Sequence, residues 1–229
     1  GAAPAPLELI KKCRELDFSF HEGYGMSETT ALAISTPYNA FRPGSCGVPY
    51  TDVELRLVDE NGNDVPLGQP GEIWMKSPYV MKEYWRNPEE TAKVFTEDGW
   101  LKSGDVAYMD EDGYVYIVDR TKDMIIAGGF NIYPREIDEV LVKHPKVADA
   151  MAVGVPDEYR GETVKAFVQL KPGVEDVTAE ELIAYCREHL APYKVPKLIE
   201  FRTEPLPRTN TGKALRRILR DEEIAKQKK

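Results

Sequence analysis

The sequence has few of the residues that build metal sites. Its 229 residues include only three cysteines and three histidines. Cys13, Cys46 and Cys186 show neither a C-x-x-C pair nor any other spacing of a structural zinc site. We therefore expect no structural zinc, and a reducing, cytoplasmic compartment.

Long apolar runs and a surplus of positive charge are also missing. No run approaches the ~20 apolar residues of a transmembrane helix, and peripheral contact with a membrane stays an open alternative. The net charge of −9 argues against nucleic acid as the main partner, because phosphate binding requires a basic surface. The 42% of hydrophobic residues can form the core of one large or two small domains. The oligomeric state is not determined by the sequence.

The chain begins with a helical pattern. Residues 7–16 place apolar side chains on one face of a helix. Because this helical pattern begins almost at the first residue and the chain does not start with Met, we expect the chain to be a piece of a longer protein. Residues 18–23 then predict a short strand that leads into a glycine-containing turn.

A region of strands follows. Polar and apolar residues alternate between positions 53 and 119, and a hairpin turn is predicted at Asp112–Gly113. One short helix interrupts this region, with Asn87 as its N-cap. We expect residues 45–119 to form a small antiparallel β-barrel subdomain or a sandwich.

The remainder, residues 120–229, predicts a compact α+β domain. The natural boundary lies where the predicted hairpin ends, between residues 119 and 120. The predicted elements are a helix from Pro134 to His144, strands at 147–155 and 162–170, a helix from Thr178 to His189, a strand near 197–201 and a helix after Lys213.

Residues 22–30, "EGYGMSETT", combine several groups that suit nucleotide chemistry. Tyr24 offers a flat aromatic face, Ser27 a hydroxyl and Glu28 a carboxylate. The third glycine of a Rossmann fingerprint is absent. An ordinary strand and turn explains the stretch equally well.

Two further motifs have plain alternatives. Asp105 in "KSGD" could accept two hydrogen bonds from a vicinal diol such as a ribose, although a Gly-Asp pair more often forms a turn. Lys213 in "PRTNTGK" follows a glycine-containing turn, but the upstream glycine and the following Ser or Thr of a Walker loop are missing. A single Lys of this kind is usually a solvated surface residue. The "DEDG" at 110–113 lacks the other ligands of a calcium loop and predicts a hairpin turn.

Together and in this order, "GYGMSET", "GWLKSGD", "YIVDRTKDMIIAGGFNIYPREIDEVL" and "PRTNTGK" resemble the adenylate-forming superfamily of acyl-CoA synthetases, aryl-CoA ligases, luciferases and peptide-synthetase adenylation domains. The resemblance covers essentially the whole chain, and "GVPDEYRGETVKAFV" and "APYKVPK" look most like long- and medium-chain fatty acyl-CoA ligases. It implies an α+β fold in which residues 1–119 end a large N-terminal domain and residues 120–229 form a mobile C-terminal domain. It also implies a ligase that uses ATP and Mg²⁺ to convert a fatty acid into acyl-AMP and then transfers the acyl group to CoA.

The resemblance also implies a role for individual residues. Lys213 would reach the forming acyl phosphate, and Glu28 would act in catalysis by holding the magnesium ion. Tyr24 would stack on adenine, and Ser27, where the family usually has Thr, would touch the α-phosphate. Asp105 would accept both ribose hydroxyls. The implied nucleotide-binding residues are Gly1, Ala2, Ala3, Tyr24, Gly25, Ser27, Asp105 and Arg120.

The second half-reaction is implied to use other residues. Lys122 would be the hinge of the small domain, and Gly128 and Gly129 would leave room for the pantetheine arm of CoA. Some relatives carry a second catalytic lysine at the position of Ile126, so we assign no lysine to this step.

The family's Ser/Thr/Gly-rich phosphate loop and most of the acyl pocket would lie upstream of this sequence. We therefore expect this fragment alone not to adenylate fatty acids, and the acyl chain length stays undetermined. Two alternatives remain. The acyl group could pass to the pantetheine of a carrier protein, or the chain could be a non-catalytic module that binds AMP or a partner.

Overall fold

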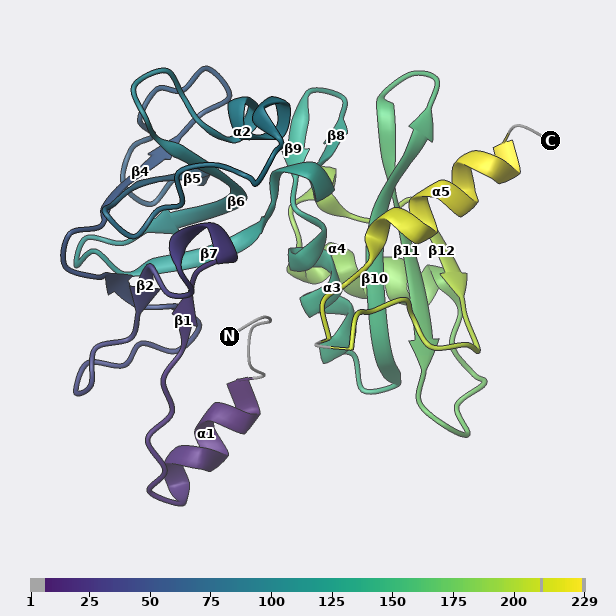
Figure 1. Ribbon diagram of the computed structural model, residues 1–229. Helices are drawn as coiled ribbons and strands as arrows, with labels where there is room; N and C mark the ends of the chain where they lie inside the picture. The colour runs from purple at the N-terminus through teal and green to yellow at the C-terminus, as the bar shows by residue number, and fades with distance from the viewer. Residues whose placement is uncertain (1–6, 211, 228–229) are drawn as a thin grey trace. The chain divides into compact units, whose positions relative to one another are not determined.

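The computed structural model describes residues 7–210 and 212–227. The chain divides into two compact units, Gly1–Thr121 and Lys122–Lys229 (Figure 1). The boundary predicted between residues 119 and 120 lies close to this division. Within the described ranges, no helix is long and apolar enough to cross a bilayer.

The N-terminal unit consists mainly of short antiparallel strands. Its elements are α1 (Leu7–Glu15), β1 (Gly23–Tyr24), the 3₁₀ helix η1 (Ser27–Thr29), β2 (Ile34–Ser35), β3 (Val48–Pro49), β4 (Glu54–Val58), β5 (Gly71–Lys76), α2 (Pro88–Val94), β6 (Leu101–Met109) and β7 (Val115–Arg120).

These strands form two antiparallel sheets in the orders β1-β2-β3 and β4-β5-β6-β7. The antiparallel prediction is confirmed, but the predicted barrel is wrong because β4 and β7, at the two ends of the larger sheet, do not pair with each other among the described strands. Val115 of β7 forms an isolated bridge with Gly47 instead. Ala33, Ile34 and Cys46 of the smaller sheet region pack into the same core as Ile73 and Leu101. The two sheets thus share one hydrophobic core.

The strand predicted at residues 18–23 is also wrong for most of its length. Regular pairing begins only at Gly23, opposite Ser35, and the side chain of Phe18 is 65% exposed. The N–H of Phe18 donates instead to the carbonyl of Cys13 at 2.8 Å, at the end of α1, so this part of the segment is bound to the helix and not to a strand.

The C-terminal unit has longer strands. Its elements are β8 (Ile125–Ala127), β9 (Phe130–Ile132), α3 (Pro134–Lys143), β10 (Val147–Asp157), β11 (Gly161–Leu170), α4 (Ala179–His189), the 3₁₀ helix η3 (Pro192–Lys194), β12 (Leu198–Phe201) and α5 (Arg216–Gln227). The 3₁₀ helix η2 (Thr121–Asp123) spans the division between the units.

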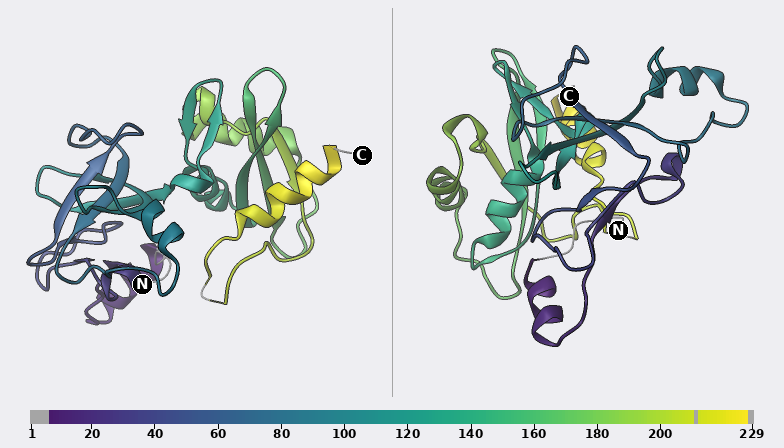
Figure 2. Two further views of the ribbon diagram at one scale, coloured as in Figure 1. Left: turned by 45° about the horizontal axis from the view of Figure 1, so that its top comes forward. Right: turned by 90° about the vertical axis from the view of Figure 1, so that its left-hand side faces the viewer.

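One five-stranded sheet organises this unit. Its order is β10-β11-β8-β9, and β12 pairs with β11 in parallel. Helices α3 and α4 cover one face of the sheet and α5 crosses the other (Figures 1 and 2). Ile137 and Leu182 enter the core on the first face, whereas Leu219 joins Met151 and Phe167 on the second. The predicted α+β class is confirmed.

The local signals for helices in the sequence act as expected. The side chain of Asn87 accepts a hydrogen bond from the N–H of Glu90 at 3.2 Å, at the start of α2. The hydroxyl of Thr178 accepts one from the N–H of Glu181 at 3.1 Å, at the start of α4. Each cap satisfies a backbone donor that the helix itself leaves unpaired.

Candidate active site

Tyr24 and Asp105, predicted from separate motifs, meet in the N-terminal unit. Tyr24 ends β1 and Asp105 lies in β6, 81 positions later, yet the Tyr24 hydroxyl donates to Asp105 Oδ2 at 2.7 Å. Burial raises the pKa of Tyr24 far above its ordinary value, and the charge of Asp105 raises it further. The phenol therefore stays protonated and fixes the position of the carboxylate.

Asp105 lies at an irregularity in the β5–β6 register, and side chains hold the backbone there. The Ser103 hydroxyl accepts from the N–H of Asp105 at 3.0 Å, and Glu72 Oε1 accepts from the N–H of Gly104 at 3.0 Å. Gly104 has a φ of 72°, which favours glycine. Arg120 stands opposite Asp105 in the β6–β7 register. Glu72 carried no signal in the sequence, because its partner Gly104 lies in another strand.

Ser27 and Glu28 lie in η1, directly after β1. The Thr29 hydroxyl holds this turn, since it accepts from the N–H of Met26 at 3.1 Å and donates to the carbonyl of Met26 at 3.0 Å. The chain then folds back so closely that a Cβ on Gly25 would lie 1.7 Å from the carbonyl oxygen of Ala31. Glycine is therefore required at 25 by the backbone itself.

The carboxylate of Glu28 is oriented by Tyr84. The Tyr84 hydroxyl donates to Glu28 Oε1 at 2.7 Å across 56 positions of sequence. This hydrogen bond, with a smaller contribution from burial, raises the pKa of Tyr84 to about 12. The N–H of Met81 donates to the backbone carbonyl of Glu28 at 2.7 Å. The sequence carried no signal for Tyr84.

Glu28 offers one carboxylate to a metal ion. Among the described residues, no three His, Cys, Asp or Glu side chains gather as a metal site. Magnesium commonly binds through one or two carboxylates together with substrate phosphates rather than in a cage of protein ligands. A single oriented Glu28 fits that mode of binding.

Lys213 lies in the C-terminal unit, on a turn closed by its own backbone. Its N–H donates to the hydroxyl of Thr209 at 3.0 Å, and its carbonyl accepts from the N–H of Thr209 at 2.9 Å. Arg208 braces the turn by donating to Gly212 O at 3.2 Å and to both carboxylate oxygens of Asp149 at 2.8 and 3.1 Å. The side chain of Lys213 is exposed, and no described residue is hydrogen-bonded to its ammonium group.

Gly128 and Gly129 form the two-residue turn between β8 and β9. Their φ angles of 61° and 83° are those of a tight hairpin turn that glycine adopts without strain. A Cβ on Gly129 would meet nothing within 4 Å. Ile126 is 53% exposed on the same hairpin.

The remaining predicted residues are Lys122 and the first three residues of the chain. Lys122 is exposed in η2 and is the first residue of the C-terminal unit. Gly1, Ala2 and Ala3 lie outside the described residues.

The chain matches two family models. Residues 1–85 match the model of the AMP-binding enzyme and residues 136–213 that of the AMP-binding enzyme C-terminal domain. The long-chain-fatty-acid–CoA ligase of Yersinia pestis is 51% identical over 204 residues, which are 89% of this chain and 36% of the relative. The ligase of the same name from Bacillus subtilis is 49% identical over 226 residues, 97% of this chain and 40% of the relative.

Solved structures agree with these matches. The O-succinylbenzoate coenzyme A synthetase from Bacillus subtilis, in complex with AMP, superposes with a TM-score of 0.83 and 38% identity over 96% of this chain and 45% of that chain. The chain thus spans less than half the length of each of these three proteins.

Proposed function

Because this chain belongs to the adenylate-forming family of AMP-binding enzymes, we propose that it is the C-terminal part of a long-chain fatty acid–CoA ligase. The observation that carries the proposal is the Tyr24–Asp105 pair. It joins an aromatic face for adenine to a carboxylate for ribose hydroxyls. The identity of about half its residues to long-chain-fatty-acid–CoA ligases supports the choice of acid and acceptor.

In the first half-reaction, a carboxylate oxygen of the fatty acid attacks the α-phosphorus of ATP and pyrophosphate leaves. Tyr24 and Asp105 hold the adenosine, and the Ser27 hydroxyl contacts the α-phosphate. Magnesium, held by Glu28 and phosphate oxygens, would reduce the repulsion between the two anions. The ammonium group of Lys213 stabilises the negative charge that moves during the transfer.

In the second half-reaction, the thiol sulfur of CoA attacks the acyl carbonyl and AMP leaves. Gly128 and Gly129 carry no side chains, so the pantetheine arm can pass close to the backbone of their turn. Ile126 provides no cation for this step. Lys122, the first residue of the C-terminal unit, is the hinge in this proposal.

We place the reaction in the cytoplasm. Cys13, Cys46 and Cys186 are all unpaired, which supports a reducing compartment. Fatty acid, ATP and CoA are the expected small-molecule partners.

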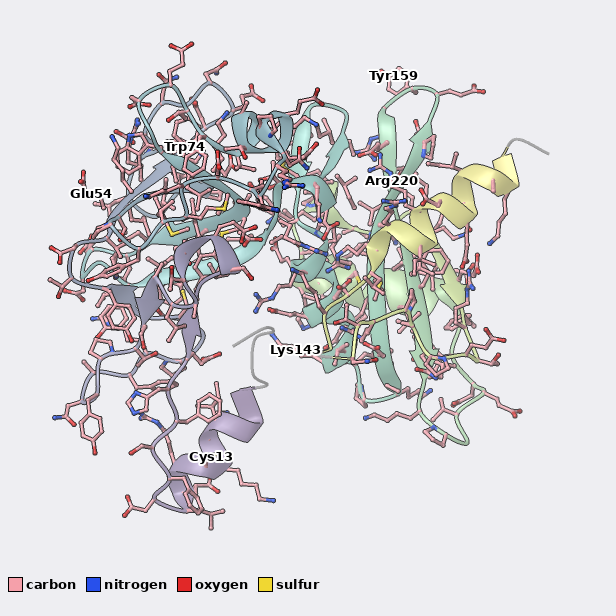
Figure 3. All side chains as sticks on the ribbon, viewed as in Figure 1. Cys13, Glu54, Trp74, Lys143, Tyr159 and Arg220 are labelled. Carbon is pink, nitrogen blue, oxygen red and sulfur yellow. The ribbon has the colours of Figure 1, made fainter. Side chains whose placement is uncertain are left out.

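The proposal is tested by pyrophosphate release from ATP with long-chain fatty acids, measured on the full-length protein. Lys213→Ala should lower this rate on the order of 10²-fold, as expected for removal of a preorganised charge. Lys143→Ala is the matched control, because Lys143 is also an exposed lysine of the C-terminal unit (Figure 3). Equal rates for both variants would contradict the role of Lys213, and a parent without any fatty-acid-dependent release would contradict the proposed function.

A further inference from the structure

The glycine hairpin, defined here as residues 125–132, pairs with the neighbouring strand β11 over a short length. Strand β8 pairs with β11 only at Ala127 and Gly161 among the described residues. The N–H of Gly128 donates to the backbone carbonyl of Arg160 at 2.8 Å. Because this backbone pairing is short, side chains contribute to holding the hairpin, and Ile125, Ala127 and Ile132 are buried in the core of the unit.

Glu162 adds a hydrogen bond from a side chain on β11. Its Oε2 accepts a hydrogen bond from the N–H of Ile126 at 2.9 Å. Ile126 faces Asn131 in the hairpin register, and its N–H points to the other side, toward β11. The Glu162 side chain is only 17% exposed. A charged acceptor in a largely buried position makes a strong and well-defined bond to a backbone N–H.

The other carboxylate oxygen of Glu162 is bound by helix α5. Arg220 Nη2 lies 2.5 Å from Glu162 Oε1. In Figure 3, Tyr159 marks the β10–β11 turn and Arg220 marks the face of α5 that lies over these strands. Both oxygens of one carboxylate are thus engaged, one with the hairpin and one with α5.

The neighbouring strand leaves room for this side chain. A Cβ on Gly154 of β10 would lie 2.9 Å from Glu162 Oε2 and 3.0 Å from its Cδ. The φ angle of Gly154 is not positive, so any residue could adopt this backbone conformation. Glycine at 154 provides the space in which the Glu162 carboxylate lies.

We propose that Glu162 is a positioning residue for acyl transfer: it fixes the glycine hairpin at Ile126, while Arg220 and Gly154 fix the carboxylate. This inference rests on the proposed function, because it assigns the hairpin to the CoA-dependent step. Glu162 does not touch the reacting atoms. Its loss should therefore affect the thiol step and spare adenylation.

The test separates the two half-reactions in the full-length protein. Acyl-AMP formation is measured without CoA, and acyl transfer is measured from preformed acyl-AMP at varied CoA. Glu162→Ala should slow acyl transfer about tenfold and raise the KM for CoA, because a small misplacement of reacting groups has a large effect on rate. Adenylation should stay at the parental rate.

Two further variants separate positioning from folding. Glu162→Gln keeps a carbonyl oxygen for the N–H of Ile126 and should lose less than Glu162→Ala. Gly154→Ala leaves Glu162 in the chain but displaces its carboxylate, so it should lower the same step. Glu158→Gln, on the exposed β10–β11 turn, is the control and should leave both steps unchanged.

Parental acyl transfer in Glu162→Ala and Gly154→Ala would overturn the inference, and so would an equal loss in both half-reactions. A parent protein that forms no acyl-AMP would instead refute the proposed function. In that case amide hydrogen exchange of Ile126 still tests whether Glu162 holds the glycine hairpin. Glu162→Ala should accelerate the exchange, and an unchanged exchange rate would refute the placement.

Discussion

Replacing Gly25 by Ala should damage the proposed adenylation site, although the change adds only one methyl group. The added Cβ would lie 1.7 Å from Ala31 O, 2.7 Å from Ala31 C and 2.8 Å from Leu32 Cα. All three atoms belong to the backbone, so no side-chain rotation can relieve the contact. The segment between residues 26 and 31, which carries Ser27 and Glu28, has to move away.

The size of the effect follows from these distances. An ordinary van der Waals contact of the Cβ needs at least 3.4 Å, so the segment has to shift by more than an ångström. Overpacking of this kind costs about 1–3 kcal/mol of unfolding free energy. A shift of that size also breaks the 2.7 Å hydrogen bond between Tyr84 and Glu28. Misplacing a reacting group by about 1 Å lowers rates on the order of 10²-fold.

Gly23→Ala is the matched control, two positions earlier in the same segment. Its Cβ would meet Leu32 Cδ2 at 2.9 Å and Ile34 O at 3.1 Å. Leu32 is 45% exposed and its methyl group can turn away, so this change should alter stability by no more than about 1 kcal/mol. Thermal unfolding of the chain and pyrophosphate release by the full-length protein measure the two effects. Equal stability and equal activity for the two variants would refute the reasoning.

Asp149→Asn should lower the rate of adenylation about tenfold, because it loosens the contact by which Arg208 holds the Lys213 turn. The loss of stability should stay below about 1 kcal/mol, because the Arg208–Asp149 pair is partly exposed. An equal loss of rate in acyl transfer from preformed acyl-AMP would contradict this. The C-terminal unit should also lose stability in acid. Burial by itself would raise the pKa of Glu200. Hydrogen bonds from Lys165 and Lys226 outweigh burial and lower this pKa from 4.5 to about 2. This stabilisation is complete above pH 4.5 and is lost as the pH falls through about 2. Thermal unfolding across this range should show a smaller acid dependence in Glu200→Gln, and identical pH profiles would contradict the assignment.

The sequence predicted the elements whose signals are local. The caps at Asn87 and Thr178, the proline at the first position of α3 and the hairpin at Asp112–Gly113 each depend on neighbours within a few positions. The motifs around Tyr24 and Asp105 were also recognised locally. Their direct contact was not predicted, because it joins strands of two different sheets.

Other parts of the site could not be found from the sequence. Tyr84 and Glu72 act on residues 56 and 32 positions away, and no spacing rule links such pairs. The barrel prediction failed for a related reason. A period of two shows which face of each strand is buried, but it does not show whether the edge strands meet or a second sheet covers the core.

The sequence alone determined the α+β class and the family resemblance, because these depend on residue type and order, and it supplied the side chains proposed to react. Tertiary structure decided how those side chains are held. The clearest case is Glu162, whose carboxylate joins the N–H of Ile126 to Arg220 over the space left by Gly154. Each of these three partners lies on a different element, so only the packing of β8, β10 and α5 around β11 brings them together.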